Sequence, residues 1–389
     1  MTDSWDDAEE NAGRGAPPAE NVPLVVDLDG SLLRTDLLLE SALLLINQRP
    51  WLVFWMPLWL LRGRAYLKRR IFQRVHLDVS LLPANEDLLA WLREQKARGR
   101  RLVLATASDY DQACLVVAPL ALFDTVLGSD GQRNLKGREK LKTIVELCGE
   151  RFDYVGNSSA DLTIWRNCRH AIVVNASTRI ERSARRVGTV VRVFPPSLTP
   201  LRDMLRLMRL EQWYINLLIF VPAIISQTIL DEPVWSNATL AFLSFGFAAS
   251  AAYILNDLLD LEADRRHATN RHRSLASGRT FIGSGILLGL ACLSASLALA
   301  IWLPTAFSLA LIAYLVLASM YSLLLQRLFV IDVLALALLY TLRIIAGHLA
   351  TGVPLSVRSV SVGFLLLLCC SAWRSANKPQ YQRWLGSRG

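Results

Sequence analysis

Residues 239–267 read TLAFLSFGFAASAAYILNDLLDLEADRRH, an apolar run that ends in regularly spaced oxygen-bearing side chains. Asn256, Asp260 and Asp264 are four residues apart, so on a helix they share one face. Like charges so placed repel one another and are costly at the end of a membrane helix. A solvated helix end would not explain carboxylates on one stripe beside an apolar span. The spacing therefore predicts a functional site at the end of a membrane helix.

The side chains on this stripe suit a divalent cation and a diphosphate. Hard oxygen ligands on one face are what Mg²⁺ needs to bridge to a diphosphate. The cation then stabilises the leaving diphosphate as its charge grows. We therefore expect Asn256, Asp260 and Asp264 to be metal ligands. We expect the arginines that follow to make charge-assisted hydrogen bonds to phosphate oxygens; they are Arg265, Arg266, Arg271 and Arg273.

Six apolar runs predict membrane spans. They cover residues 213–230, 239–255, 281–303, 307–325, 329–350 and 360–372, and the last is short. Arginines cluster before the first run and after the second, whereas the loop that carries Asp231 and Glu232 has no Lys or Arg. Because basic residues mark the cytosolic side, the pattern predicts a multi-pass protein of the inner (cytoplasmic) membrane with a cytosolic N-terminal domain and no cleavable signal peptide.

The composition agrees with a chain partly dissolved in lipid, since 53% of the residues are hydrophobic and 19% are charged. The net charge of +9 would suit nucleic acid or an anionic membrane face. Its arginines gather at the ends of apolar runs, which favours the membrane and no nucleic-acid partner. Asp332 and Arg343 lie inside apolar runs, where ionisable residues are functional by default; a structural pair between the two is the alternative.

The motif Asn-Asp-x-x-Asp-x-x-x-Asp resembles the aspartate-rich first motif of the UbiA prenyltransferase superfamily. Residues 264–267, 275–278, 321–322, 330–333 and 342–347 are most similar to its decaprenyl-phosphate phosphoribosyltransferase branch. The resemblance implies a Mg²⁺-dependent transferase that joins phosphoribosyl diphosphate to a polyprenyl phosphate and releases diphosphate. It adds Tyr321, Asp332 and Arg343 to the substrate-binding residues. Prenyl transfer to an aromatic or quinone acceptor, as in other branches, is the alternative.

Several positions depart from that branch. Ala268, Asn270 and Ser274 replace a Pro, a Lys and a Pro, and Gln326 stands where a Lys normally follows the Tyr-Ser pair. The superfamily also has more spans and a second acidic motif, so we expect an incomplete bundle, shortened at its C-terminal end. A truncated, inactive membrane protein that binds lipid phosphates is therefore a third hypothesis.

The N-terminal half alternates predicted strands with helices. Strand-like runs at 22–26, 102–105, 153–155 and 171–174 are separated by helical patterns at 85–98, 111–118, 137–148 and 160–167. This alternation predicts a doubly wound α/β domain with a parallel sheet. Polar residues end the first three runs, at the strand ends where such sheets collect their chemistry.

Asp27 and Asp29 are two apart on an extended segment, so both can point the same way. One carboxylate can attack phosphorus while the other exchanges a proton with the leaving group. Two carboxylates beside a phosphate repel one another, so the site needs Mg²⁺ and a Lys. The spacing predicts a site that handles a phosphate ester.

Four motifs in order resemble the haloacid dehalogenase superfamily, in its phosphoserine-phosphatase-like branch. They are residues 27–31 (DLDGS), Thr106, residues 134–137 (NLKG) and residues 156–161 (GNSSAD). The resemblance implies Asp27 as nucleophile, Asp29 as acid/base, Thr106 and Lys136 as further catalytic residues, and Mg²⁺ held by Asp27, Asp29, Asn157 and Asp161. Asn157 stands where the superfamily usually has Asp, which leaves two readings: a slow phosphatase or a binding remnant.

Residues 37–82 lie where that superfamily places a helical cap. Within them, residues 51–61 read WLVFWMPLWLL, too short to cross a bilayer and followed by basic residues. This run is either the core of the cap or a surface that rests on the membrane. The expected organisation is a disordered tail (1–21), the phosphatase-like domain (22–187), a linker (188–200), the membrane domain (201–373) and a polar tail (374–389).

Overall fold

The computed structural model describes residues 22–130, 132–196, 200–323, 329–355, 361, 363–365 and 368–369. The chain divides into two compact units. The first, here called the sheet unit, comprises residues 1–199 together with 262–282. The second, the membrane unit, comprises residues 200–261 and 283–389. The expected tails at 1–21 and 374–389, and most of the sixth expected span, lie outside the described residues.

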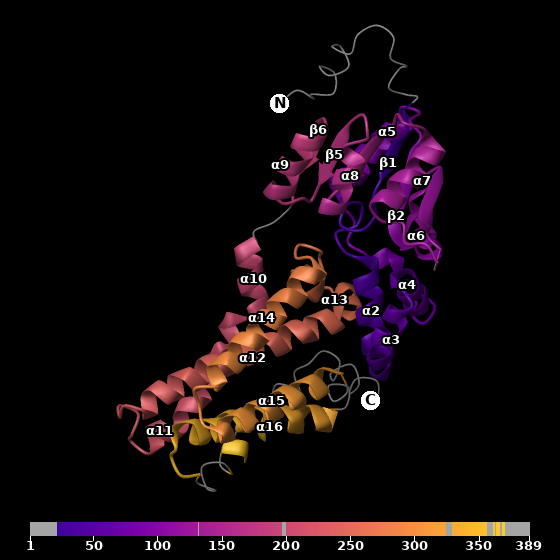
Figure 1. The fold of residues 1–389 in the computed structure, drawn as a ribbon. Helices are drawn as coiled ribbons and strands as arrows, with labels where there is room; N and C mark the ends of the chain where they lie inside the picture. The colour runs from indigo at the N-terminus through magenta and orange to yellow at the C-terminus, as the bar shows by residue number, and fades with distance from the viewer. Residues whose placement is uncertain are drawn as a thin grey trace. The chain divides into compact units, whose positions relative to one another are not determined.

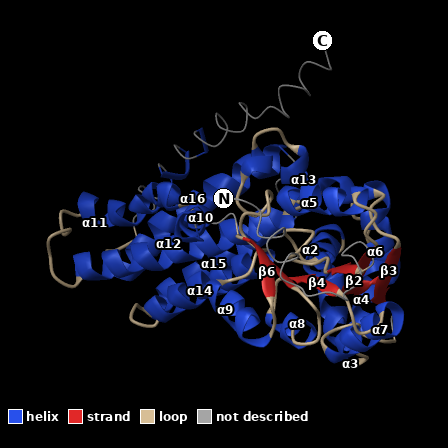
Figure 2. Ribbon diagram, turned by 90° about the horizontal axis from the view of Figure 1, so that it is seen from above, coloured by secondary structure: helices blue, strands red, loops and turns tan. Residues whose placement is uncertain are grey.

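The sheet unit contains one six-stranded sheet in its described part, with strand order β3-β2-β1-β4-β5-β6. All neighbouring strands are parallel, and Figure 2 shows them in red. The strands are β1 (Leu24–Val26), β2 (Leu102–Asp109), β3 (Thr125–Ser129), β4 (Asp153–Gly156), β5 (Ala171–Val174) and β6 (Val190–Phe194). The predicted parallel α/β fold is confirmed.

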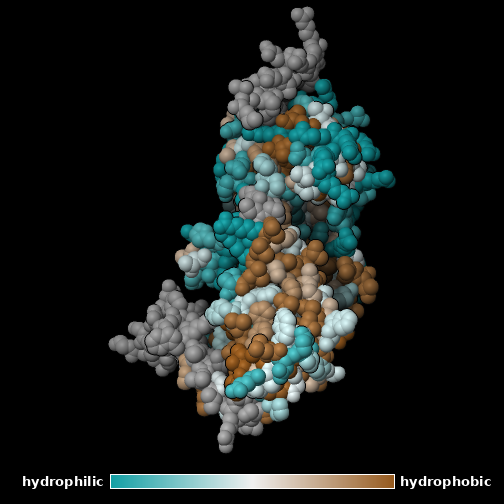
Figure 3. Space-filling model, turned by 90° about the vertical axis from the view of Figure 1, so that its left-hand side faces the viewer, coloured by the Kyte–Doolittle hydropathy of each residue, from teal (hydrophilic) through white to brown (hydrophobic). Residues whose placement is uncertain are grey.

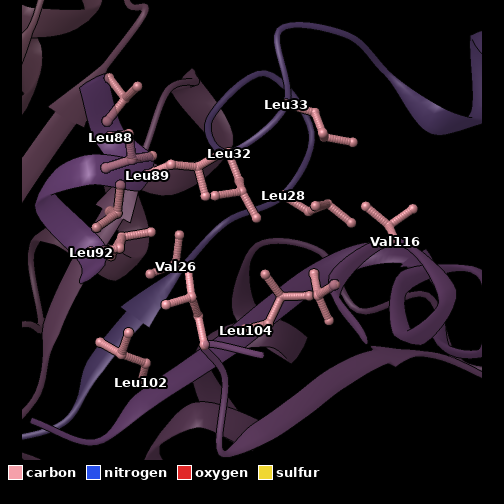
Figure 4. Close-up of a cluster of buried hydrophobic side chains, with 14 of the residues drawn as sticks. Val26, Leu28, Leu32, Leu33, Leu88, Leu89, Leu92, Leu102, Leu104 and Val116 are labelled. Carbon is pink, nitrogen blue, oxygen red and sulfur yellow. The ribbon is translucent and has the colours of Figure 1, made fainter. Parts of the chain in front are cut away.

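Helices cover both faces of this sheet. They are α5 (Glu86–Ala97), α6 (Tyr110–Val117), η4 (Ala118–Leu120), α7 (Arg138–Cys148), η5 (Ser159–Asp161), α8 (Leu162–Trp165) and α9 (Thr178–Val187). Because strand side chains alternate between faces, β1 contributes Val26 to one buried cluster and Val25 to another. Figure 4 shows the first cluster, which includes Val26 of β1, Leu104 of β2 and Leu92 of α5. A separate core on each face is the mark of a three-layer α/β architecture.

The structure differs from the expected linker at residues 188–200. Val190–Phe194 forms β6 and pairs with β5, with Val193 opposite Val173. The run VVRVF is rich in β-branched residues, which suit a pleated strand, so the domain extends beyond residue 187. Strand β3 was also absent from the sequence-based expectation.

The segment expected as a cap is helical. It contains α2 (Leu37–Gln48), η2 (Pro50–Trp55), α3 (Met56–Leu61), α4 (Arg64–Phe72) and η3 (Val79–Leu81), drawn in indigo in Figure 1. Asp36 caps α2 by accepting hydrogen bonds from the backbone of Leu38 and Leu39. A small core around Leu45 and Ile71 joins α2 to α4.

The membrane unit is helical. Its elements are α10 (Pro200–Met208), η6 (Leu210–Phe220), α11 (Val221–Ile225), α12 (Val234–Leu259), α14 (Ile282–Ala300), α15 (Thr305–Leu323) and α16 (Phe329–Thr351). In the described part of the chain, four helices are long and apolar enough to cross a membrane: α12, α14, α15 and α16. The protein is therefore an integral membrane protein. Much of the surface of this unit that Figure 3 shows is hydrophobic, whereas that of the sheet unit is mostly hydrophilic.

The first expected span, residues 213–230, is not one long helix. It is occupied by η6 and the short α11, which together fall below the length of the four long helices. Pro222 stands near the start of α11, and a proline inside a helical pattern removes a backbone hydrogen bond.

Candidate functional site

In the sheet unit, Asp29, three residues after the end of β1, meets Thr106 in the C-terminal half of β2. Asp29 accepts hydrogen bonds from Ser108 Oγ at 2.6 Å and Thr106 Oγ1 at 3.3 Å. Its other oxygen accepts the backbone N–H of Leu37 at 2.9 Å. Two adjacent parallel strands thus bring together two of the predicted catalytic residues, and Ser108 is a third group that the sequence did not single out.

Asp27 is buried against a lysine. Lys140 Nζ lies 2.6 Å from Asp27 Oδ1, and both side chains are almost fully buried. Burial raises the pKa of Asp27 to about 7, with Lys140 opposing that shift and the Asp161 carboxylate adding to it. Burial lowers the pKa of Lys140, but the Asp27 and Asp161 carboxylates outweigh it and leave the pKa raised. Asp27 and Lys140 therefore form a buried ion pair at this site.

The position expected of Lys136 is taken by Lys140. The side chain of Lys136 is exposed, whereas Lys140 contacts Asp27. Gly137, with φ of +59°, precedes α7, so the helix starts one residue after the motif. Within its first turn Lys140 falls on the buried face with Ile144. A lysine does lie beside Asp27, as the sequence predicted. The residue at which α7 begins, and not the motif, determines that this lysine is Lys140.

Both carboxylate oxygens of Asp161 accept hydrogen bonds. Its Oδ1 accepts Tyr154 Oη at 2.8 Å, and its Oδ2 accepts the backbone N–H of Asn157 and Ser158 and the hydroxyl of Ser158. Asn157 packs on Gly30, where an added Cβ would lie 1.9 Å from its Nδ2. The fourth motif therefore forms a rigid turn beside Asp27.

This donor set does not fit a magnesium cage built by the protein alone. Asp27 is paired with Lys140, both oxygens of Asp29 and of Asp161 accept hydrogen bonds, and Asn157 is neutral. Among the described residues, no three His, Cys, Asp or Glu side chains are placed to hold one ion. We assign no step in this unit to a metal ion.

Lys68, on the cap helix α4, contacts β2 and the third motif of the sheet unit. Its Nζ donates to Ala107 O at 2.5 Å and to Asn134 Oδ1 at 3.3 Å. Burial lowers its pKa, and the Asp29 carboxylate opposes that shift. A cation from a separate helix therefore stands beside the strand-end carboxylates, a contact across 39 residues that no local motif signals.

In the membrane unit, a cavity of about 190 Å³ lies among α12, α15 and α16. Three predicted residues line it: Asn256, Tyr321 and Arg343. It also has lining residues that the sequence analysis did not select; among them are Arg209, Gln212, Tyr253, Tyr314 and Tyr340. Two guanidinium groups and several phenol hydroxyls make this cavity suited to an anion.

Arg343 is buried and held in place within the bundle. It donates to Asn216 Oδ1 at 2.8 Å, to the carbonyl of Leu339 at 2.6 Å and to Tyr314 Oη at 3.1 Å. Asp332, also buried, accepts the hydroxyl of Tyr321 at 2.7 Å. Each predicted intramembrane ionisable residue thus has a defined polar partner.

Asn256 and Asp260, the first two predicted metal ligands of the aspartate-rich motif, lie together. Asn256 Nδ2 donates to Asp260 Oδ2 at 3.1 Å, which is the geometry expected four residues apart. Helix α12 ends at Leu259 with Asp260 as its capping residue, so the motif does not continue as one helix. Asp257, on another face, pairs with Arg209 at 2.5 Å.

The rest of the motif belongs to the sheet unit, because the boundary falls between Leu261 and Glu262. Asp264, in the short helix α13 (Leu261–Arg266), accepts Arg273 at 2.7 Å and Asn270 Nδ2 at 2.9 Å. The segment continues through η7 (Asn270–His272). A third metal ligand at Asp264 stays a prediction.

Arg265 is committed to a different partner from the one expected. Its guanidinium binds both oxygens of Glu40, at 2.6 and 3.1 Å, and the carbonyl of Ala276. The two side chains are 6% and 3% exposed. Arg266 pairs with Glu262 and Asp78, while Arg271 is exposed. Three of the four arginines, Arg265, Arg266 and Arg273, thus have carboxylate partners, and both side chains of the Arg265 pair are buried.

Residues 217–378 match the UbiA prenyltransferase family. The chain is 37% identical over 351 residues to the uncharacterized protein y4nM of Sinorhizobium fredii, which covers 89% of this chain and 68% of y4nM. It is 36% identical over 123 residues to the decaprenyl-phosphate phosphoribosyltransferase of Mycobacterium tuberculosis, covering 32% of this chain and 41% of that protein. The chain thus spans about two thirds of the first relative and less than half of the second.

Two solved structures are similar to parts of the chain. A UbiA homolog from Archaeoglobus fulgidus bound to DMAPP and Mg²⁺ is 26% identical, with a TM-score of 0.39 over 43% of this chain and 60% of that one. An apo phosphoserine phosphatase is 14% identical, with a TM-score of 0.33 over 48% of this chain and 98% of that one.

Proposed function

Because the chain belongs to the same family as y4nM and carries a UbiA prenyltransferase-family domain at residues 217–378, we propose that it is a Mg²⁺-dependent membrane transferase. Its substrates are a diphosphate donor and a polyprenyl or polyprenyl-phosphate lipid. The observation that carries this proposal is the cavity of the membrane unit, where Asn256 of the aspartate-rich motif lies with Arg209 and Arg343.

Asn256 and Asp260 are the residues that would hold the metal ion in the membrane unit. Mg²⁺ is commonly bound through one or two carboxylates plus substrate phosphates, so two protein side chains and a diphosphate form a suitable donor set. When bound, the ion supplies charge neutralisation for the departing diphosphate. Arg343, fixed by Asn216 and Tyr314, would orient the anion, and Arg209 would add a second guanidinium.

We favour phosphoribosyl diphosphate as the donor. The similarity of the chain to the mycobacterial phosphoribosyltransferase supports this choice. In such a reaction the phosphate oxygen of the lipid forms a bond to the anomeric carbon of the sugar, while the bond from that carbon to the diphosphate breaks. Prenyl transfer to an aromatic or quinone acceptor is the alternative, in which a prenyl diphosphate is the donor.

A donor assay with the full chain in lipid vesicles separates the two. Labelled phosphoribosyl diphosphate with a polyprenyl phosphate should give a labelled lipid and free diphosphate, and Arg343→Gln should abolish both products. Product from a prenyl diphosphate and an aromatic acceptor would move the assignment to the alternative reaction. No product from either donor would favour the third hypothesis, an inactive lipid-phosphate-binding protein.

For the sheet unit we propose a haloacid-dehalogenase-like site that binds a phosphate ester. The Asp27 carboxylate would attack phosphorus while the bond from phosphorus to the ester oxygen breaks, and Asp29 would give that oxygen a proton. Water, deprotonated by Asp29, would then release phosphate from Asp27, and Lys140 would offset negative charge beside Asp27. The test is hydrolysis of p-nitrophenyl phosphate by the full chain. Lys140→Met should remove activity while Lys136→Met keeps it; the reverse order would overturn the assignment of Lys140. A wild-type chain that binds phosphate without hydrolysis would be a binding remnant.

We also propose that the chain lies in the inner (cytoplasmic) membrane with the sheet unit in the cytosol. The arginines before the first apolar run, and those at residues 265–279, support this orientation. Charged donors such as phosphoribosyl diphosphate would then reach the protein from the side on which the sheet unit stands.

A further inference from the structure

The cap carries an apolar surface that its own core leaves uncovered. Neither η2 (Pro50–Trp55) nor α3 (Met56–Leu61) has a buried residue. Leu61 is 84% and Phe54 79% exposed. Five further large apolar side chains of these elements are exposed, namely Trp51, Val53, Trp55, Leu58 and Leu60. An exposed apolar patch of this kind marks a site of interaction with a protein or a membrane.

The inward side of the same segment is already satisfied. Leu52, Met56 and Trp59 pack against the small core that joins α2 and α4. The segment is therefore apolar on both sides, with one side packed and the other bare. A helix that is hydrophobic all round is expected to be buried, so the bare side requires an occupant.

Arginines stand beside this bare surface. Arg62 and Arg70 donate to the hydroxyl of Tyr66 at 3.1 and 2.8 Å, and Arg74 lies 4.9 Å from the centre of the Trp59 ring. Throughout the described part of the chain, no carboxylate forms an ion pair with Arg62, Arg70 or Arg74. Among the described carboxylates, the three guanidinium groups therefore have no ion-pair partner.

These charges and the apolar side chains share one hollow. A depression of about 660 Å³ is lined by Arg62, Arg70 and Arg74 together with Tyr66, and by apolar residues of η2 and α3 that include Trp55 and Trp59. Guanidinium groups over aromatic rings keep their outward N–H groups available to a phosphate. The depression thus combines apolar side chains with three arginines.

We propose that the outer face of η2 and α3, with Arg62, Arg70 and Arg74, docks on the surface of an anionic lipid bilayer. Trp and Leu side chains would enter the interface while the arginines contact lipid phosphates. The charge pattern favours a bilayer over a protein partner, because lipid headgroups supply the acidic groups that the arginines lack. The spanning helices of the same chain hold the cap near a membrane at high effective concentration.

The test uses the full chain in vesicles. A fluorescent NBD group is attached at Phe54→Cys, after the six native cysteines have been replaced. Vesicles of phosphatidylcholine, with or without phosphatidylglycerol, carry brominated acyl chains that quench a probe in the interface. We expect strong quenching in the anionic vesicles, and much less in neutral vesicles or at high salt. A probe at the exposed Glu150→Cys should remain unquenched in both.

Charge removal provides the matched comparison. The triple variant Arg62→Gln, Arg70→Gln, Arg74→Gln should lose most of the quenching at position 54. The control triple Arg93→Gln, Arg138→Gln, Arg166→Gln removes the same charge from exposed positions elsewhere and should keep it. Absence of quenching in anionic vesicles, or equal quenching in neutral ones, would overturn the proposal. A blue-shifted probe that bromolipids do not quench would show a protein occupant instead.

Discussion

Asp153 is a buried carboxylate of the sheet unit that pairs with two arginines. It is fully buried and contacts Arg100, Arg169 and the backbone N–H of His170. Burial raises its pKa, but hydrogen bonds from Arg169 and His170 and the charge of Arg100 outweigh it and leave the pKa below the ordinary value of 3.8. A lowered pKa in the folded state means that Asp153 stabilises the fold above pH 3.8 and loses this effect as the pH falls further.

We therefore predict that Asp153→Asn destabilises the sheet unit at pH 7 by about 3–5 kcal/mol, since it leaves Arg100 buried without its charge partner. The difference from wild type should shrink below pH 3.8. Thermal unfolding of the full chain in detergent over a pH series measures it. Glu150→Gln, at an exposed position, is the control; equal midpoints for wild type and Asp153→Asn at pH 7 would contradict the prediction.

The Glu40–Arg265 pair gives a second prediction at this scale. Thr35 also donates to Glu40, at 2.6 Å, so Glu40→Gln would leave a buried guanidinium and disturb a hydrogen-bonded network. Backbone amides of residues 262–282 should then exchange with deuterium faster in the full chain. Glu262→Gln, which breaks the more exposed pair with Arg266, should have little effect. An unchanged exchange rate in Glu40→Gln would show that the pair does not hold this segment.

The role of a residue could be predicted from the sequence only where a local pattern places its side chain. Asp27, Asp29 and Thr106 could be placed because they follow apolar strands, and parallel strands end at one edge. Lys140 could not be distinguished from Lys136 without knowing where α7 begins. The partner of Arg265 is 225 residues away, so no local pattern could reveal that a presumed phosphate ligand is an internal ion pair.

Among the helices, α16 meets η6 unusually closely at Gly347. A Cβ added there would lie 2.2 Å from the backbone oxygen of Ile219. Small residues allow such close approach between helices in membranes. We predict that Gly347→Ala separates the two elements and destabilises the membrane unit by about 1–3 kcal/mol. The measurement is unfolding of the full chain in mixed micelles with increasing sodium dodecyl sulfate, followed by circular dichroism.

Gly283 is the matched control for this substitution. It lies in α14 with nothing within 4 Å of an added Cβ. Because Ala favours helix more than Gly does, Gly283→Ala should leave the unfolding midpoint equal or slightly raised. If both variants unfold together with wild type, the close contact at Gly347 has no part in stability.

Elements with a strong period were predictable and irregular ones were not. Helices α5 and α7 and strands β1, β4 and β5 lie within a few residues of their expected positions. Strand β6 was assigned to a linker because Pro195 and Pro196 follow it. The first apolar run predicts a span, but Pro222 lies within it and the structure has η6 and α11 there, so hydropathy alone does not fix helix length.

At the scale of the whole molecule, the arginine pattern predicts which loops face the cytosol. Residues 262–282 are part of the sheet unit, so this segment and residues 22–196 must lie on the same side of the membrane. In intact cells, a membrane-impermeant maleimide should label Asp231→Cys but label Arg271→Cys only after lysis. Both variants belong in a background without the native cysteines. Labelling of Arg271→Cys in intact cells would invert the orientation.

The composition predicts an N-terminal α/β domain and a C-terminal membrane domain. It does not predict that residues 262–282, which lie between two membrane helices in the sequence, belong to the sheet unit. Residues 262–282 begin inside the aspartate-rich motif and include Asp264, yet they fold with the sheet unit, where Arg265 pairs with Glu40. Only the tertiary structure reveals this, because neither residue carries a signal for the other.

In the membrane unit, we propose that Asn256 and Asp260 bind a diphosphate through Mg²⁺. Calorimetric titration of inorganic diphosphate into the full chain in detergent tests it most directly. We predict binding only when Mg²⁺ is present, and a loss of affinity of at least about tenfold, or 1.4 kcal/mol, in Asp260→Asn. Lys136→Met should bind as wild type does. Binding that needs no Mg²⁺, or that is unchanged in Asp260→Asn, would contradict the claim.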